Sequence, residues 1–262
     1  MEFVNLINPV EFKIYLLVLT RISLVLFMLP VFSTTMFPAL CKAGLAMVIS
    51  LLIYSVVHVD PAIFPETIIG AGMIFLSEAM IGITIGLCIR TFFGSVELAG
   101  QIIGFQMGFS MINVVDPQSG ANISIMEQIG YWVTILIFLA LNGHHIMLLA
   151  LIESFRLVPP GFFVIHKLML SKVLDIGADM FILGIKIGAP VIAALLFTSA
   201  AFGLMAKFSP EMNVMIVAFP LKIFVGLILF GFSLEIVIFV VRDYIAHFKG
   251  LLMSLLYFAG GG

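Results

Sequence analysis

Residues 187–206 read IGAPVIAALLFTSAAFGLMA and contain no Asp, Glu, Lys or Arg. This stretch decides the fold class, because a helix needs about 20 apolar residues to cross roughly 30 Å of hydrocarbon. Further charge-free runs cover Ile22–Cys41, Ala43–Val59, Leu98–Val115 and Gln128–Ile152. Together these runs predict an all-α integral membrane protein.

The composition of the whole chain agrees with this prediction. Of 262 residues, 63% are hydrophobic and 10% are charged, whereas a soluble domain has roughly 45–50% apolar and 25% charged residues. Membrane barrels would show strands of about ten residues with alternating polarity. The continuous apolar runs Trp132–Ala140 and Val191–Phe197 favour helices. The net charge of −2 and the scattered basic residues argue against a nucleic-acid partner.

The helices that we expect cover Pro9–Leu29, Ala39–Val57, Glu66–Gly100, Asn122–Ile152, Asp175–Lys207 and Glu211–Lys249. The last two form a hairpin. In it, Ser209 is expected to cap the second helix, with Pro210 at the first helical position. Pro190 and Pro220 fall inside these helices and predict kinks.

Charged residues interrupt the apolar sequence at Arg21, Glu78, Arg90, Lys186, Lys222 and Glu235. Each charge at the centre of a bilayer costs about 2.5–3.5 kcal/mol on insertion scales. Two interpretations remain open: pairing between helices or subunits, and an aqueous pathway for ions or substrate. So many charges favour a subunit of a larger assembly. Gly82 and Gly86 form a small-xxx-small pair that allows close helix packing.

Catalytic and metal-binding patterns are missing from the sequence. His144 and His145 are adjacent, so on a helix they point about 100° apart and cannot share a metal ion as i,i+4 histidines do. No GxSxG elbow and no phosphate-binding loop is present. Cys41 and Cys88 lie in apolar runs and are expected to be buried thiols. We therefore expect no enzyme activity, no cofactor and no metal site.

The stretch Gly104–Pro117, GFQMGFSMINVVDP, is the strongest candidate for a functional segment. Gly104 and Gly108 permit close approach or a break in the helix. Met107 and Met111 are flexible apolar groups that adapt to irregular surfaces. Such a segment could seal a pore and reshape around a passing chain, and ordinary core packing is the alternative.

At this stretch the sequence resembles the FliR family of the bacterial type III export apparatus, and more distantly its injectisome counterparts. The resemblance covers essentially the whole chain. The residues that carry it are Arg21 with Pro30–Phe32, Glu78 with Gly82 and Gly86, Gly100–Phe109 leading to Asp116-Pro117, Asn142–His145, Ser209–Val214, Phe219–Ile223 and Val225–Leu227.

The resemblance implies a helical export gate in the bacterial inner membrane, within the flagellar basal body. Expected partners are FliP-type and FliQ-type subunits, FlhB-type and FlhA-type export components and unfolded export substrates. Residues 1–174 would form a FliP-like part, residues 175–250 a FliQ-like hairpin and residues 251–262 a C-terminal tail. In this family the helices need not cross lipid as ordinary spans.

The family also has a plug loop that helps to close the channel, and residues of about 104–120 match its position. The plug residues that the resemblance implies are Gln106, Met107, Gly108, Phe109, Ser110, Met111, Ile112, Asn113, Val114, Val115, Asp116 and Pro117. The leading hypothesis is a non-enzymatic channel subunit for protein export. The alternative is a secondary transporter of a small solute, with Glu78 or Lys222 as ion-coupling groups. An intramembrane protease is disfavoured because no paired aspartates are evident.

Overall fold

The computed structural model describes residues 8–33, 38–57, 64–65, 67–109, 124–163, 166–209, 211 and 213–259. Within these ranges the chain forms helices and turns and no strand. Helices Ile68–Met107, Lys167–Phe208 and Ile216–Ala259 are long and apolar enough to cross a membrane, and a broken pair, Ile125–Ala140 with Gly143–Leu157, is a further candidate span. The prediction of an all-α membrane protein is confirmed.

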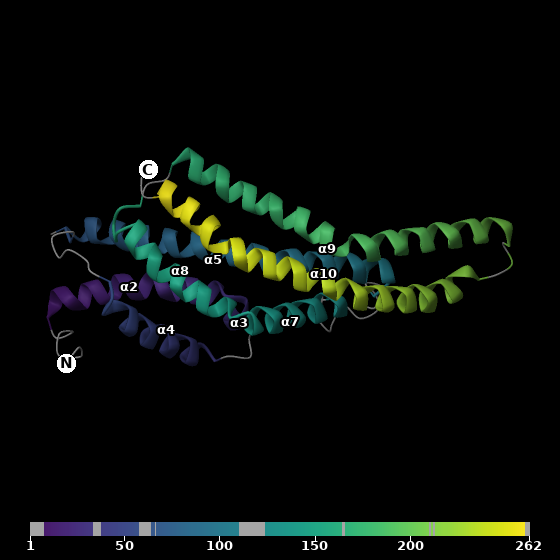
Figure 1. Ribbon diagram of the computed structural model, residues 1–262, viewed down its shortest axis with the longest axis horizontal. Helices are drawn as coiled ribbons and strands as arrows, with labels where there is room; N and C mark the ends of the chain where they lie inside the picture. Colours follow the sequence, from purple (N-terminus) through teal and green to yellow (C-terminus); the bar gives the residue numbers. More distant parts are fainter. Residues whose placement is uncertain are drawn as a thin grey trace. The chain divides into compact units, whose positions relative to one another are not determined.

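The helices follow one another in the order α2 (Pro9–Met28), α3 (Pro30–Ser33), α4 (Ala39–Tyr54), α5 (Ile68–Met107), α7 (Ile125–Ala140), α8 (Gly143–Leu157), α9 (Lys167–Phe208) and α10 (Val214–Ala259) (Figure 1). They make two compact units. Unit 1 comprises Met1–Thr91, Asn142–Gly177 and Ile245–Gly262, and unit 2 comprises Phe92–Leu141 and Ala178–Tyr244. Helices α5, α9 and α10 therefore contribute residues to both units.

Two predicted boundaries are wrong in the middle of the chain. Helix α5 does not end at Gly100 but continues without a break to Met107. The single helix expected over Asn122–Ile152 is two helices, because α7 ends at Ala140 and α8 begins at Gly143. Between them Asn142 has a left-handed backbone with φ 55°. Asparagine tolerates this conformation better than most residues, which allows the break.

The expected hairpin of α9 and α10 is present, but its predicted cap is wrong. Helix α10 begins at Val214, after Asn213, so Ser209 is not its N-cap. The N–H of Ser209 instead donates to the Met205 carbonyl at 2.9 Å, which extends the end of α9. Helix α9 contains Pro190 and bends partway along its length (Figure 1). Residues 251–259, expected as a tail, continue α10 to Ala259.

In unit 1, helix α2 packs along α4 and against α5. The Tyr54 hydroxyl on α4 donates to the Glu11 carboxylate on α2. A Cβ added at Gly82 would lie 2.9 Å from the Arg21 carbonyl oxygen, and one at Gly86 would lie 2.6 Å from Met28 Sδ. The close packing predicted for these two glycines is therefore confirmed. Glu78 lies four residues before Gly82, so it shares the face of α5 that meets α2.

In unit 2, the end of α5 packs against α7, α9 and α10. A Cβ at Gly184 of α9 would lie 2.9 Å from the carbonyl oxygen of Ser95 on α5. The Phe92 ring stacks on Tyr244 of α10, with ring centroids 4.0 Å apart. The two cysteines differ, since Cys88 is buried and Cys41 is exposed, so the prediction of two buried thiols is wrong for Cys41.

Candidate functional site

The interior of unit 1 contains an ion pair between Arg21 of α2 and Glu78 of α5. Both side chains have no solvent exposure. Arg21 Nε donates to Glu78 Oε2 at 2.7 Å, and Arg21 Nη2 donates to Glu78 Oε1 at 3.0 Å. This two-pronged geometry matches the planar guanidinium to the carboxylate, and it neutralises both charges away from water.

The remaining hydrogen-bonding groups of the pair bind the end of α8 and the turn after it. Arg21 Nη1 donates to Ser154 Oγ at 3.2 Å, and Nη2 also donates to the Val158 carbonyl at 3.1 Å. The N–H of Gly161 donates to Glu78 Oε1 at 3.2 Å. The guanidinium carbon lies 4.1 Å from the centroid of the Phe155 ring. The ion pair thus fixes three segments that are distant in the sequence.

The turn at Gly161 depends on its residue type. Gly161 has φ +87°, a left-handed backbone conformation that residues with a Cβ rarely adopt. In this conformation the N–H of Gly161 donates to Glu78 Oε1. The sequence marks a break here through Pro159-Pro160-Gly161. Nothing in the sequence pattern links this break to Glu78, so the contribution of Ser154, Val158 and Gly161 was missed.

The other charges singled out in the sequence lie elsewhere. Arg90, Lys186 and Glu235 are exposed in the chain by itself, and Lys222 is partly exposed. The structure therefore brings Arg21 and Glu78 together and places the other four at or near the surface. Their pairing with partner subunits stays a prediction.

The first part of the candidate plug segment forms the end of α5 in unit 2. The N–H of Phe109 donates to the Gly104 carbonyl, and the N–H of Gly108 donates to the Phe105 carbonyl, both at 3.1 Å. Gly108 has φ +94°. These two bonds with a positive-φ glycine form a Schellman C-cap, which ends the helix at a defined residue. Ser110–Pro117 lie outside the described residues.

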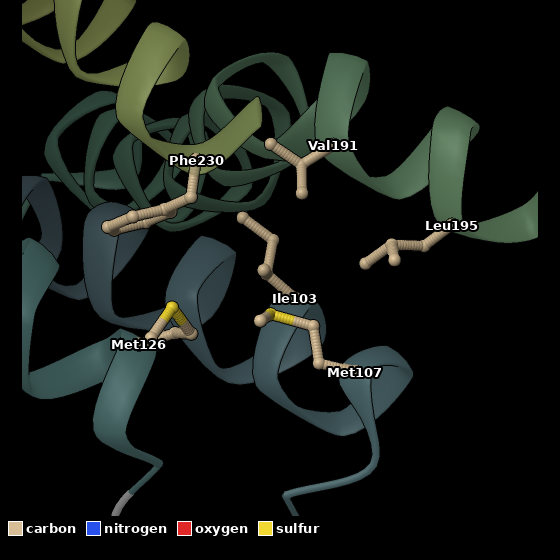
Figure 2. Close-up of a cluster of buried hydrophobic side chains, with 6 residues drawn as sticks. All are labelled: Ile103, Met107, Met126, Val191, Leu195 and Phe230. Carbon is tan, nitrogen blue, oxygen red and sulfur yellow. The ribbon is translucent and has the colours of Figure 1, made fainter. Parts of the chain in front are cut away.

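Met107 is completely buried in a cluster of apolar side chains. Figure 2 shows that the members of this cluster, contributed by α5, α7, α9 and α10, point toward one another: Ile103, Met107, Met126, Val191, Leu195 and Phe230. Phe109 packs against the same cluster. A Cβ at Gly226 of α10 would lie 2.7 Å from both Cγ and Sδ of Met107. For Met107, core packing is what the structure shows.

The two residues before Met107 are less buried than Met107 itself. Gln106 is partly exposed although its Oε1 atom is buried. Phe105, on the last turn of α5, is 70% exposed. The start of the candidate segment therefore has one fully anchored side chain, Met107, followed by a glycine turn.

The fold, the Arg21–Glu78 pair and the Met107 cluster define a multi-pass helical membrane protein, in which long apolar helices enclose a buried ion pair and a methionine-containing core. The groups assembled at both places are paired charges or apolar side chains, so their evident role is to position segments of the chain.

Comparison with known proteins identifies the family. Residues 12–248 match the family described as "Bacterial export proteins, family 1", and the chain belongs to this family. The flagellar biosynthetic protein FliR of Bacillus subtilis (strain 168) is 32% identical over 237 residues, which cover 88% of this chain and 90% of the relative. FliR of Escherichia coli (strain K12) is 29% identical over 82% of each chain. FliR of Aquifex aeolicus (strain VF5) is 29% identical over 95% of each.

These similarities agree with the resemblance found in the sequence. The chain is a component of the flagellar type III export apparatus and a multi-pass protein of the bacterial inner membrane.

Proposed function

We propose that the chain is a non-enzymatic channel subunit of the flagellar type III protein export gate. It assembles with FliP-type and FliQ-type subunits, and Gln106–Pro117 help to close the pore. The observation that carries this proposal is the family match over residues 12–248, together with relatives whose names are flagellar biosynthetic proteins. Residues 1–174 would be the FliP-like part and residues 175–250 the FliQ-like hairpin.

Exposed apolar side chains on the hairpin support assembly with partners. Helix α9 exposes Leu196, Phe197, Leu204, Met205 and Phe208, and α10 exposes Ile216, Val217, Leu221, Phe224, Leu227, Ile228 and Phe232. Exposed apolar area of this extent marks contact with protein or lipid. Lys207 is exposed at the end of α9, and Lys222 is partly exposed within α10. Because charges are costly in lipid, partner subunits are the better cover for this part of the hairpin.

The end of α5 supports a plug that is anchored at its beginning. Met107 is held in the core of unit 2 and Gly108 turns the chain out of the helix. A segment that closes a pore needs a fixed attachment, and the C-cap of α5 supplies one. In this proposal Met107 anchors the segment in the core of unit 2, and the other residues of Gln106–Pro117 help to close the pore.

The transporter hypothesis loses support from the ion pair. An ion-coupling carboxylate must exchange its ion or proton with water during the transport cycle. Glu78 has no exposure, and its two oxygens accept hydrogen bonds from Arg21 and Gly161. It is therefore committed to a structural pair.

The test is native mass spectrometry of the tagged full chain, co-expressed with FliP-type and FliQ-type proteins and solubilised gently. We expect a defined hetero-oligomer that contains this chain at a fixed ratio. A stable monomer or homodimer that excludes both partners would contradict the proposal. In that case transport assays for small solutes become the next measurement.

A further inference from the structure

In unit 2, helix α9 packs one side against α5 and carries two charged residues on the opposite side. A Cβ added at Gly184 would lie 2.9 Å from the Ser95 carbonyl oxygen, and Ile187 is buried. Lys186 is exposed, and it lies two residues, or about 200°, around the helix from Gly184. Asp179 is also exposed, and it precedes Lys186 by about two turns, or roughly 10 Å along the axis. Asp179 and Lys186 therefore share the side of α9 that points away from α5.

The surface around these two charges is apolar. Phe181, Ile182 and Ile185 are each about half exposed. Within the described ranges, neither Asp179 nor Lys186 makes a hydrogen bond or an ion pair with another residue of this chain. Water at this surface would leave the apolar side chains uncovered, whereas lipid would surround the two charges with hydrocarbon. A protein surface that offers both apolar contacts and opposite charges satisfies both requirements.

A two-fold contact with a second copy of the chain does not fit this side of α9. Copies inserted in one membrane have the same orientation, so the two-fold axis between them is parallel to the membrane normal. Such a contact places Lys186 of one copy opposite Lys186 of the other. Like charges that face each other across a contact oppose binding. The surface that covers this side therefore differs from it, with a carboxylate opposite Lys186 and a basic side chain opposite Asp179.

We propose that the side of α9 defined by Asp179, Ile182 and Lys186 binds a helix of a partner subunit. That helix carries a carboxylate and a basic residue about two turns apart. The apolar side chains supply contact area, and the two charges fix the depth at which the helices meet, because a shift by one turn would separate both pairs. The inference rests on the proposed assembly with FliP-type and FliQ-type subunits. It goes further in naming the surface and the charges that select the partner.

The test uses the full chain, co-expressed with FliP-type and FliQ-type proteins and purified in mild detergent. Lys186→Glu places a carboxylate against that of the partner, so we expect the yield of hetero-oligomer to fall about tenfold or more. Lys186→Arg keeps the charge and should retain the yield. The matched control is Lys167→Glu, the same change at an exposed residue about 100° around α9. It should leave the yield unchanged.

A second measurement separates loss of binding from loss of folding. Each variant chain is purified alone and unfolded in detergent. Because Lys186 and Lys167 are both exposed, we expect both charge reversals to unfold at the same denaturant concentration as the unmodified chain. Destabilisation of the isolated chain by Lys186→Glu would place the role of this lysine inside the chain and overturn the inference.

A suppressor screen then identifies the residue opposite Lys186. The genes for this chain and its two partners replace those of a flagellated bacterium, Lys186→Glu is introduced, and all three genes are mutagenised. Selection for swimming should return substitutions that replace one partner carboxylate by Lys or Arg. Suppressors confined to this chain, for example at the exposed Glu235, would indicate a contact within the chain or between its copies and would overturn the inference.

The outcomes also separate this inference from the function on which it rests. If the unmodified chain forms no complex with FliP-type and FliQ-type proteins, the proposed function is wrong and the inference falls with it. If the unmodified chain assembles and Lys186→Glu assembles equally well, only the inference is overturned.

Discussion

The centres of unit 1 and unit 2 solve the same packing problem with different chemistry. In unit 1 a fully buried Arg21 is bound to Glu78, Ser154 and Val158. In unit 2 the centre is an apolar cluster around Met107 and Met126. Hydrogen bonds to a guanidinium are directional, whereas dispersion contacts with a thioether are not.

The two cores are therefore expected to differ in the substitutions that they tolerate. Removing one partner of a buried ion pair leaves an uncompensated charge, which is far more costly than the pair's net contribution. A methionine core loses stability through lost contacts and a cavity, and its flexible side chains refill part of the space. The core of unit 1 thus depends on particular hydrogen-bonding partners, whereas the core of unit 2 depends mainly on the volume that its side chains fill.

The largest expected effect is that of Arg21→Met. The variant leaves Glu78 buried and charged, so we expect the free energy of unfolding to fall by about 3–5 kcal/mol. The measurement is unfolding of the purified chain in detergent. The control is Arg156→Met, because Arg156 is exposed and its contact to Glu153 is 3.7 Å long. That control should change stability by less than about 0.5 kcal/mol. Equal stability of both variants would contradict the role of the pair.

Truncation of the unit 2 core comes next. Met107→Ala removes a completely buried side chain and should cost about 3 kcal/mol in the same unfolding experiment. Met73→Ala is the control, since Met73 lies on the same helix and is 69% exposed. A loss for Met107→Ala no greater than that for Met73→Ala would show that the cluster is not a core.

A smaller effect is expected at the C-cap of α5. Gly108→Ala places a Cβ at a φ of +94° and 2.6 Å from Phe219 Cε1, so we expect a loss of about 2 kcal/mol. Gly231→Ala is the control, because an added Cβ there has no atom within 4 Å. Alanine at position 231 should be neutral or stabilise the helix by up to about 1 kcal/mol. Unchanged stability of Gly108→Ala would argue against the cap.

The smallest net change is expected when both charges of unit 1 are removed. Arg21→Met with Glu78→Leu leaves no buried charge, so most of the loss seen for Arg21→Met should return. A residual loss of about 1 kcal/mol is expected, because the Val158 carbonyl and the Gly161 N–H lose their partners. If the double variant is as unstable as Arg21→Met, the cost does not come from the unpaired charge.

The sequence predicts that the helices exist better than it predicts where they end or which of their residues contact one another. The apolar run at 187–206 marks α9, and the small residues Gly82 and Gly86 mark a close contact. The break at Asn142 was missed, because a single αL residue inside an apolar run leaves the hydropathy pattern unchanged. The start of α10 at Val214 was missed as well, since Ser209 fits the preference for a cap, Pro210 that for the first helical position and Glu211 that for the first turn.

For the candidate site, the sequence singled out Arg21 and Glu78 individually and the segment that begins at Gln106. It could not show that these two charges meet each other, because a guanidinium can pair with any carboxylate that the fold brings near. It also could not show that Met107 is core, since a methionine suits a pore lining and a packed interior equally well.

By itself the sequence determined that the chain is helical and embedded in a membrane, since both follow from sums over neighbouring residues: apolar length, charge and proline position. Only the tertiary structure decided that Arg21 binds Glu78, 57 residues away, and that Gly100 admits the backbone of Glu127. Contacts of this kind depend on how distant segments are brought together, and no local sum contains that information. The physical reason is that hydrophobicity is a property of each residue, whereas pairing is a property of the assembled fold.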